Sequence, residues 1–334
     1  MKKFKKMNYS ILDLAYVMKG DSFTETFEKS ALSIQIAEEL GYTRYWVSEH
    51  HNMENVISSA TSIFIGYLAG KTKKIRVGSG GIMLPNHTTL SIAEQFGTLD
   101  AMYPNRIDLG LGRAPGTDAL TAQRLRRGSL DFNYPFEQHI EELELYFSSE
   151  NATSKVRALP GEGANVPLYM LGSSTDSAFL SAKLGLPYAF AGHFAPAQFF
   201  AAHKIYHENF QPSERLANPY MLLCANFILA DTVEEAHYLS KTMYQGFANI
   251  VTDHRKPIVS PDETTLENLS KEQLAVVQNM TAFSFIGDVE TVRTNLEAFL
   301  TPNPVDEIIV STNIYNFENK LHSYRLTADI FNAE

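Results

Sequence analysis

The sequence of 334 residues contains one cysteine, Cys224, which lies in an apolar run. A single cysteine forms no disulfide framework and no thiolate zinc site, and a chain of this length buries a core that needs neither. No run approaches the ~20 apolar residues of a membrane span. The basic segment from Met1 to Lys6 leads into a stretch that contains Asp13 and lacks a small-residue cleavage site, so we expect no signal peptide. These absences predict a cytoplasmic protein that does not enter a membrane.

Positive charge is also scarce. The chain has 28 Lys and Arg residues against 38 Asp and Glu residues, a formal net charge of −10 at pH 7. That balance argues against nucleic acid or an anionic membrane as the main partner. The apolar fraction of 44% is ordinary for a globular protein, and no internal repeat or low-complexity tract stands out. The composition therefore predicts a soluble globular protein.

Short β-rich runs alternate with longer helical patterns along the whole chain. After the first run, Phe27, Ala31 and Ile34 recur at helical spacing, with Thr24 as the expected cap. The same alternation continues through eight expected strands at residues 9–15, 45–47, 75–84, 106–111, 168–171, 188–191, 221–230 and 306–311. Such a series predicts parallel strands joined by crossover helices.

A closed barrel and an open doubly wound sheet share this alternation. Eight units match the count of a closed barrel, and no Gly-x-Gly-x-x-Gly follows the first strand. We therefore predict an α/β fold of the (β/α)8 TIM-barrel type, in which residues 1–334 form a single domain. Two connections are long, at 112–135 and 251–271. The second is a predicted loop insertion after the seventh strand, and it is either a lid over a site or a solvated surface loop.

Catalytic groups of a TIM barrel lie where the strands end. The fifth strand ends in a serine-rich segment, 172–177, just before a helix. Small hydroxyl residues at a helix N-terminus form an anion site, commonly for phosphate, although serine at this place usually just caps the helix. An arginine at the end of the fourth strand favours the anion site, because its planar fork pairs with phosphate. The candidate phosphate ligands are therefore Arg113, Ser173, Ser174 and Ser177.

The second strand ends in Glu49-His50-His51, a cluster that suggests a metal site. Adjacent residues of a strand point to opposite faces, so His50 and His51 do not both coordinate one ion from an extended segment. No third ligand is evident, although Glu49, His87 and His193 keep the idea open. We expect no metal. A histidine at this place either acts as a general base, because its ordinary pKa lies near ~6.5, or is bonded to a neighbouring loop.

Glycines interrupt the third strand at Gly78, Gly80 and Gly81, and glycine weakens a strand interior. Without side chains, this strand would let a flat ring system approach the backbone. The alternative is a bulge or a steric fit against a helix. Together with the strand-end residues on strands two to six, the glycines favour one planar, phosphorylated ligand.

Several of these motifs occur together in one known family. The runs Tyr45-Trp46-Val47-Ser48-Glu49-His50-His51-Asn52 and Val77-Gly78-Ser79-Gly80-Gly81-Ile82-Met83-Leu84-Pro85 resemble the luciferase-like flavin monooxygenases. So do residues 106–113, 171–187 and the stretch that begins at Phe285. The resemblance covers nearly the whole chain, and it is greatest to an uncharacterised bacterial subgroup of alkanal-monooxygenase-like proteins.

The resemblance implies a TIM barrel that binds FMN at its C-terminal mouth. The family's Glu-His-His motif falls on Glu49, His50 and His51, so His50 is the implied catalytic base, with Glu49 beside it. The family's non-prolyl cis peptide beneath the flavin ring would fall at Gly80-Gly81. Its phosphate contacts map onto Arg113, Ser174 and Ser177. Luciferase differs from this chain at three places: it has Ala-Ala at the position of Gly80-Gly81, Glu at Ser173 and a reactive cysteine at Gly112. Because of these differences we do not expect light emission.

The activity that the resemblance implies is a monooxygenase reaction. Reduced FMN, supplied by NADH or by a separate flavin reductase, reacts with O₂, and a small organic substrate is oxidised. Two alternatives stay open, namely hydride transfer with the deazaflavin coenzyme F420 and flavin binding without turnover. A third and more distant alternative is an isomerase or lyase with a phosphate-binding barrel. Family members frequently dimerise through the helices beside strands two and three, so we expect a homodimer.

Overall fold

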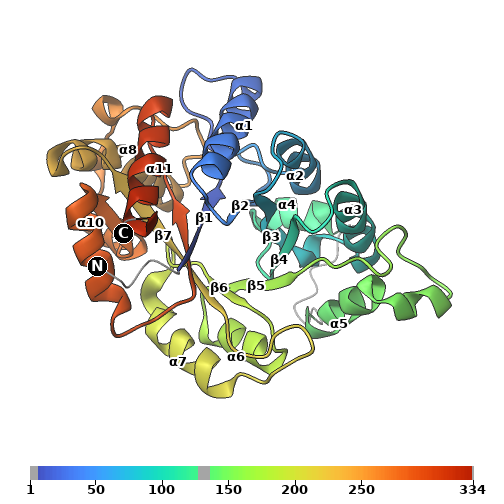
Figure 1. Cartoon of the computed structure of the whole chain (residues 1–334). Helices are drawn as coiled ribbons and strands as arrows, with labels where there is room; N and C mark the ends of the chain where they lie inside the picture. The colour runs from blue at the N-terminus through green and yellow to red at the C-terminus, as the bar shows by residue number, and fades with distance from the viewer. Residues whose placement is uncertain (1–6, 127–135, 333–334) are drawn as a thin grey trace.

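The computed structural model describes residues 7–126 and 136–332. Parallel strands form a closed barrel with helices around it (Figure 1). The barrel strands follow the ring order β1, β2, β3, β4, β5, β6, β7 and β9, after which β9 pairs with β1. Their bounds are β1 Asn8–Asp13, β2 Arg44–Val47, β3 Arg76–Met83, β4 Ile107–Gly112, β5 Leu168–Gly172, β6 Tyr188–Phe190, β7 Met221–Leu229 and β9 Glu307–Ser311. The predicted (β/α)8 barrel is thus confirmed.

Helices follow nearly every strand and pack their apolar faces on the barrel. In the described ranges they are α1 Phe23–Glu39, α2 Thr61–Ala69, α3 Thr89–Met102, α4 Ala119–Leu125, α5 Phe136–Phe147, α6 Thr175–Lys183, α7 Phe199–Asn209, α8 Val233–Val251, α9 Lys271–Met280, α10 Val289–Leu300 and α11 Phe317–Asn332. The cap of the first helix lies two residues before the expected one. Ser22, and not Thr24, is its N-cap, because Glu25 completes a reciprocal capping box with Ser22. None of the described helices is long and apolar enough to cross a membrane.

One strand was not predicted. β8 (Ser284–Gly287) pairs with the C-terminal half of β7, from Asn226 to Leu229, on the edge opposite to β9. β7 has nine residues and β6 pairs only with Met221, Leu222 and Leu223, so the rest of that edge is left for β8. A run of four residues that includes Ser and Gly carries little β-propensity, which is why the sequence did not predict a strand there. With α8 and α9, β8 builds a second apolar cluster outside the ring.

The insertion after β7 lies in the predicted place, between α8 and α9. It contains two short 3-10 turns, Pro261–Glu263 and Leu266–Asn268. Ile258 is fully buried and exchanges backbone hydrogen bonds with the segment after β1, at Val17 and Lys19. The insertion is therefore anchored on the first β–α loop. The other long connection contains α4, and its residues 127–135 lie outside the described part of the chain.

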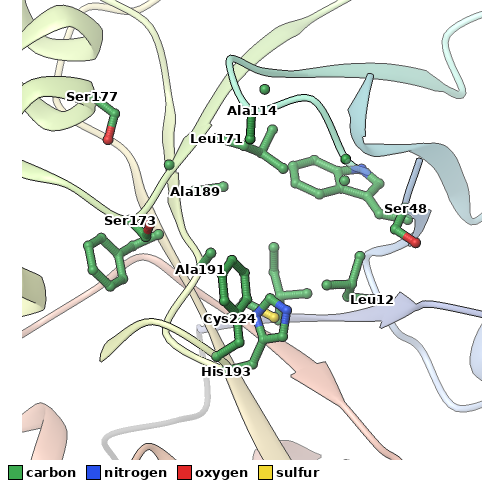
Figure 2. Close-up of a pocket in the computed structure, with 18 of the residues that line it drawn as sticks. Leu12, Ser48, Ala114, Leu171, Ser173, Ser177, Ala189, Ala191, His193 and Cys224 are labelled. Atoms are coloured by element: carbon green, nitrogen blue, oxygen red, sulfur yellow. The ribbon is translucent and has the colours of Figure 1, made fainter. Parts of the chain in front are cut away.

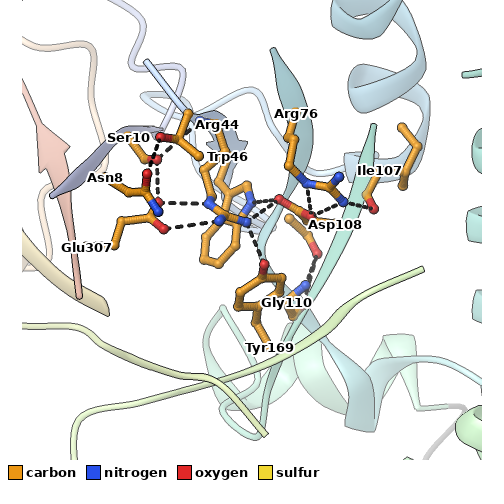
Figure 3. A network of polar contacts seen from close by, with 12 residues as sticks. Asn8, Ser10, Arg44, Trp46, Arg76, Ile107, Asp108, Gly110, Tyr169 and Glu307 are labelled. Atoms are coloured by element: carbon orange, nitrogen blue, oxygen red, sulfur yellow. Dashed lines mark hydrogen bonds and ion pairs between the residues drawn. The ribbon is translucent and has the colours of Figure 1, made fainter. Parts of the chain in front are cut away.

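The N-terminal end of the barrel is filled by a buried polar network (Figure 3). Arg44 donates to both oxygens of Glu307, over 2.8 and 3.0 Å, and to Asp108 over 2.8 Å. Asp108 also accepts from Arg76 over 2.7 Å and from the indole N–H of Trp46 over 3.0 Å. Both carboxylates are fully shielded from solvent. The charges are paired and hydrogen-bonded, as buried charges must be. Above this network an apolar layer separates it from the opposite end of the barrel.

Candidate active site

A cavity of about 450 Å³ opens at the C-terminal ends of the barrel strands. Six of the eight predicted site residues line it, namely His50, Gly80, Arg113, Ser173, Ser174 and Ser177, whereas Glu49 and Gly81 do not. Figure 2 shows Ser173 and Ser177 on one side of the cavity, Ser48 and Leu12 on the other, and His193 beside Cys224. No described residue of the insertion at 251–271 lines this cavity. Residues that are far apart in the sequence thus meet at one site, at the end of the barrel where TIM-barrel enzymes place their chemistry.

One end of the cavity has the character of an anion site. Arg113 is exposed, and no ion-pair partner for it is found among the described residues. The hydroxyl of Ser173 likewise has no hydrogen-bond partner in the described ranges. Ser173 directly precedes the N-cap of α6, whose first N–H groups and dipole favour a negative charge, and Arg113 lines the same cavity.

Ser174 and Ser177 cap α6, which is the usual role of serine at a helix N-terminus and was the alternative to direct phosphate binding. Ser174 is the N-cap, and the two side chains form a reciprocal capping box with each other's backbone N–H groups. The Ser177 hydroxyl also donates to the Ser174 carbonyl over 2.8 Å and lies 2.9 Å from the Tyr188 hydroxyl. A side chain at Gly172 would meet Ser177 Oγ at 2.1 Å, so glycine is needed there for the capped turn to approach the strand. The caps hold the helix end at the cavity wall, and Arg113 and Ser173 keep free donors.

Gly80 and Gly81 fit tightly against their neighbours. A Cβ on Gly80 would lie 2.8 Å from Leu12 Cδ1 and 3.2 Å from Trp46 Cβ, and one on Gly81 would lie 2.6 Å from the Gly110 oxygen. The pairing of β3 with β4 shifts register between Ser79 and Ile82, so the strand bulges here. The peptide bond between the two glycines is cis. The expected bulge occurs, whereas the close fit is against strands β1, β2 and β4 and not against a helix. Gly80 still lines the cavity with no side chain.

His50 faces the cavity, and a carbonyl behind it holds its ring. Its Nδ1 lies 3.2 Å from the Gly116 oxygen, which makes Nδ1 the protonated nitrogen and leaves Nε2 as an acceptor. Burial lowers the pKa of His50 below its ordinary value, against an opposing contribution from the bond to Gly116. The ring is therefore neutral near pH 7. His51 turns the other way, toward Glu49, as the alternation along an extended segment requires.

Glu49 lies behind the cavity and anchors two loops. Its carboxylate accepts from the Met83 backbone N–H over 2.9 Å and contacts His51 Nε2 at 2.9 Å and His87 Nε2 at 3.0 Å. Burial raises the pKa of this carboxyl, but the hydrogen bonds from His51 and His87 outweigh it and lower the pKa to about 2. Glu49 is thus an ionised group that ties the segment after β2 to the segment after β3. No group of His, Cys, Asp and Glu in the described ranges has an arrangement that could hold a metal ion.

The other lining residues include Trp46, His193 and Cys224, none of which was among the predicted cofactor or catalytic residues, although His193 was considered as a metal ligand. Trp46 is anchored by its bond to Asp108, so the polar network below the apolar layer reaches the cavity through this side chain. Cys224 is buried, which raises the pKa of its thiol and keeps it protonated. His193 follows β6, and its position after a strand end is the sequence signal that marks it as a candidate site residue. Trp46 and Cys224 lie inside their strands, where no such positional signal points to a site.

Comparisons with known proteins agree on one family. The family model described as luciferase-like monooxygenase matches residues 7–302. A luciferase-like monooxygenase of Escherichia coli K12 is 44% identical over 329 residues, 98% of this chain and 97% of the relative. An N-acetyl-S-alkylcysteine monooxygenase of Bacillus subtilis is 32% identical over 332 residues, 96% of this chain and 97% of the relative. Among solved structures, apo-MsnO8 superposes with a TM-score of 0.88 at 28% identity, over 98% of this chain and 99% of the other.

More distant structures share the barrel with different cofactors. The oxygenating constituent of 3,6-diketocamphane monooxygenase, solved in complex with FMN, has a TM-score of 0.69 at 16% identity and covers 98% of each chain. An F420-dependent secondary alcohol dehydrogenase has a TM-score of 0.64 at 13% identity, over 97% of this chain and 98% of the other. At these identities the likeness shows the fold alone.

Proposed function

Because the chain belongs to the luciferase-like monooxygenase family, we propose that it is an FMN-dependent monooxygenase that uses reduced FMN and O₂ to oxidise a small organic substrate. One observation carries the proposal. A single cavity gathers the free donors of Arg113 and Ser173, from the ends of β4 and β5, and the bare backbone of Gly80 from β3. A phosphate group and a flat ring need these two features side by side.

The residues present fit FMN. Arg113 would bind the phosphate through its fork, and Ser173 and the N-terminus of α6 would complete the anion site. Gly80 would accept the ring against a surface with no side chain, and Trp46 lies directly beside it. When bound and reduced, FMN supplies the electrons that activate O₂, and the protein orients the reactants and excludes water.

His50 is the proposed proton-transfer group. Its Nδ1 is bonded to Gly116, so the Nε2 lone pair can accept a proton from a reacting group in the cavity. A neutral imidazole is the form that such a base needs, and burial keeps His50 neutral. Glu49 supports this group from behind, since it fixes the segment that carries His50 without reaching the cavity.

We also propose a homodimer that uses the helices beside β2 and β3. Large apolar side chains are exposed on these helices, with Ile63 of α2 at 75% and Met102 of α3 at 60% exposure. Exposed apolar side chains on neighbouring helices would be covered in such a contact. NADH or a separate flavin reductase would supply the reducing equivalents.

A flavin titration tests the cofactor. Purified wild type and Arg113→Ala are titrated with FMN and F420, each oxidised and reduced, and binding is followed by flavin fluorescence. We expect FMN to bind and its Kd to rise about 10- to 100-fold in Arg113→Ala, because a charge-assisted pair is lost. Preference for F420 would move the chemistry to hydride transfer, and no binding of any flavin would refute the proposal.

A turnover assay tests the reaction. The FMN-loaded enzyme is supplied with NADH and a flavin reductase, and O₂ uptake is measured with a panel that includes N-acetyl-S-alkylcysteines, the compounds named for the B. subtilis relative. We expect an oxygenated product with one member of the panel, and loss of product with His50→Ala. Flavin binding without any substrate-dependent O₂ uptake would instead support a non-catalytic flavin-binding protein.

A further inference from the structure

The cavity has two walls of different character. The groups that suit the cofactor come from β3, β4 and β5, whereas the remaining wall is formed by β6, β7, β9 and β1. That second wall is mostly apolar, with Leu12, Ala189 and Ile309 among its residues. Within it, the side chains that carry a hydrogen-bonding atom are His193 and Cys224. Burial raises the pKa of the Cys224 thiol, which leaves it a weak donor.

His193 lies across the barrel from His50. β2 and β6 are four positions apart in a ring of eight strands, so the segments that follow them stand on opposite sides of the cavity mouth. The two rings are still close enough that His50 adds to the lowering of the His193 pKa. The backbone of His193 is held by Asn226, whose side-chain amide donates to the His193 carbonyl over 2.7 Å. The side chain is 7% exposed and packs edge-on against Phe194.

Neither ring nitrogen of His193 has a hydrogen-bond partner among the described residues, and Nδ1 is also closed off from solvent. Nε2 is not closed off in this way, so it is the nitrogen that a ligand in the cavity can reach. Native proteins rarely leave a largely buried polar side chain unpaired without a reason. Resting on the proposed function, we propose that His193 binds the organic substrate, and that it selects an apolar molecule carrying one uncharged hydrogen-bonding group.

The chemistry of the wall determines which group is selected. Burial, with a contribution from His50, lowers the pKa of His193 to about 3, so the ring is neutral near pH 7 and does not attract a carboxylate by charge. No carboxylate lines the cavity in the described ranges, so nothing there pairs with an ammonium group either. A neutral imidazole offers one donor and one acceptor, which suits a carbonyl or amide. Moving a charged group onto this wall would cost far more than moving a neutral one.

Three ligands of equal length test the selection, namely hexanamide, hexanoate and hexylammonium. Each is titrated into the protein loaded with oxidised FMN, and binding is followed by the perturbation of the flavin absorbance. We expect hexanamide to bind about tenfold more tightly than either ion, and its affinity to fall about tenfold in His193→Phe, which loses the hydrogen bond. His193→Gln, which keeps an uncharged donor and acceptor, should restore most of it. His322→Phe, which removes a surface histidine, should match wild type.

The affinity for FMN is the internal control, because a merely structural role for His193 would disturb it. We expect the FMN Kd of His193→Phe to stay within about twofold of wild type, since the cofactor donors lie on the other wall. Preference of the wild type for hexanoate or hexylammonium, failure to bind hexanamide, or unchanged hexanamide binding in His193→Phe would each overturn the inference. Loss of FMN binding by the wild type would refute the proposed function itself, which the other outcomes leave standing.

Discussion

The two ends of the barrel use polar residues in opposite ways. At the N-terminal end, Arg44 donates from all three of its guanidinium nitrogens, and the carboxylates of Asp108 and Glu307 each have several donors. At the C-terminal end, the side chains of Arg113, Ser173 and His193 have no hydrogen-bond or ion-pair partner in the described ranges. Satisfied polar groups stabilise the barrel, and unsatisfied ones are available to ligands. Arginine is therefore fully paired at one end and left without a partner at the other.

The largest loss of stability should come from a substitution at the N-terminal end of the barrel, where the buried charges are paired. Arg44→Met leaves the buried carboxylate of Glu307 without its cation and removes one cation from Asp108. We expect the free energy of unfolding to fall by about 3–5 kcal/mol, because an uncompensated charge stays buried. Urea unfolding measures it. Arg255→Met, which removes a partly exposed pair with Asp118, is the control and should cost at most about 1 kcal/mol. Equal losses in the two variants would contradict the comparison.

Glu49 provides a second test of the comparison, since it is a paired carboxylate at the C-terminal end of the barrel. Its pKa is lowered from an ordinary value of 4.5 to about 2, so the ionised form stabilises the fold above pH 4.5. We expect Glu49→Gln to lose about 3 kcal/mol at pH 7. The difference from wild type should shrink as the pH falls from about 4.5 toward 2, where the wild-type carboxyl becomes protonated. Urea unfolding at several pH values checks this, and a difference that does not depend on pH would show that Glu49 acts through shape alone.

Gly80 tests whether the cavity floor is as tightly packed as the rest of the barrel. Gly80→Ala would place a methyl group 2.8 Å from Leu12 and 3.2 Å from Trp46, and overpacking of this kind costs about 1–3 kcal/mol. Thermal unfolding measures the loss. Gly66→Ala in α2 is the matched control, because its methyl group meets only the flexible end of Leu99 and alanine favours a helix. If Gly80→Ala were as stable as that control, the floor would have room for a side chain.

The smallest effect on stability should come from Arg113. This side chain is exposed and makes no ion pair within the described ranges, so Arg113→Ala should change the free energy of unfolding by less than about 0.5 kcal/mol. The same variant should bind FMN much more weakly. Unfolding measured without and with FMN separates the two effects, since only the stabilisation by ligand should fall. A clear loss of stability without ligand would place Arg113 among the structural residues.

Sequence reasoning reached much of the fold because the signals were local. All eight expected strands overlap an observed barrel strand over most of its length, and their ends differ by at most two residues. The cap of the first helix was misplaced because Thr24 was chosen by residue type, whereas Ser22 stands three residues before Glu25 and forms the capping box with it. β8 was missed because it is stabilised by an already buried β7 rather than by its own residues.

The sequence by itself determined the alternation of strands and helices, the strand-end residues and the motifs of the family. These follow from periodicity and residue type over short stretches. Only the tertiary structure decided which of those residues meet. It placed Glu49 behind the cavity and His50 in it, because adjacent side chains point to opposite faces. It brought Arg113 to Ser173 and set His193 across from His50, because closure of the barrel joins strand ends that lie far apart along the chain.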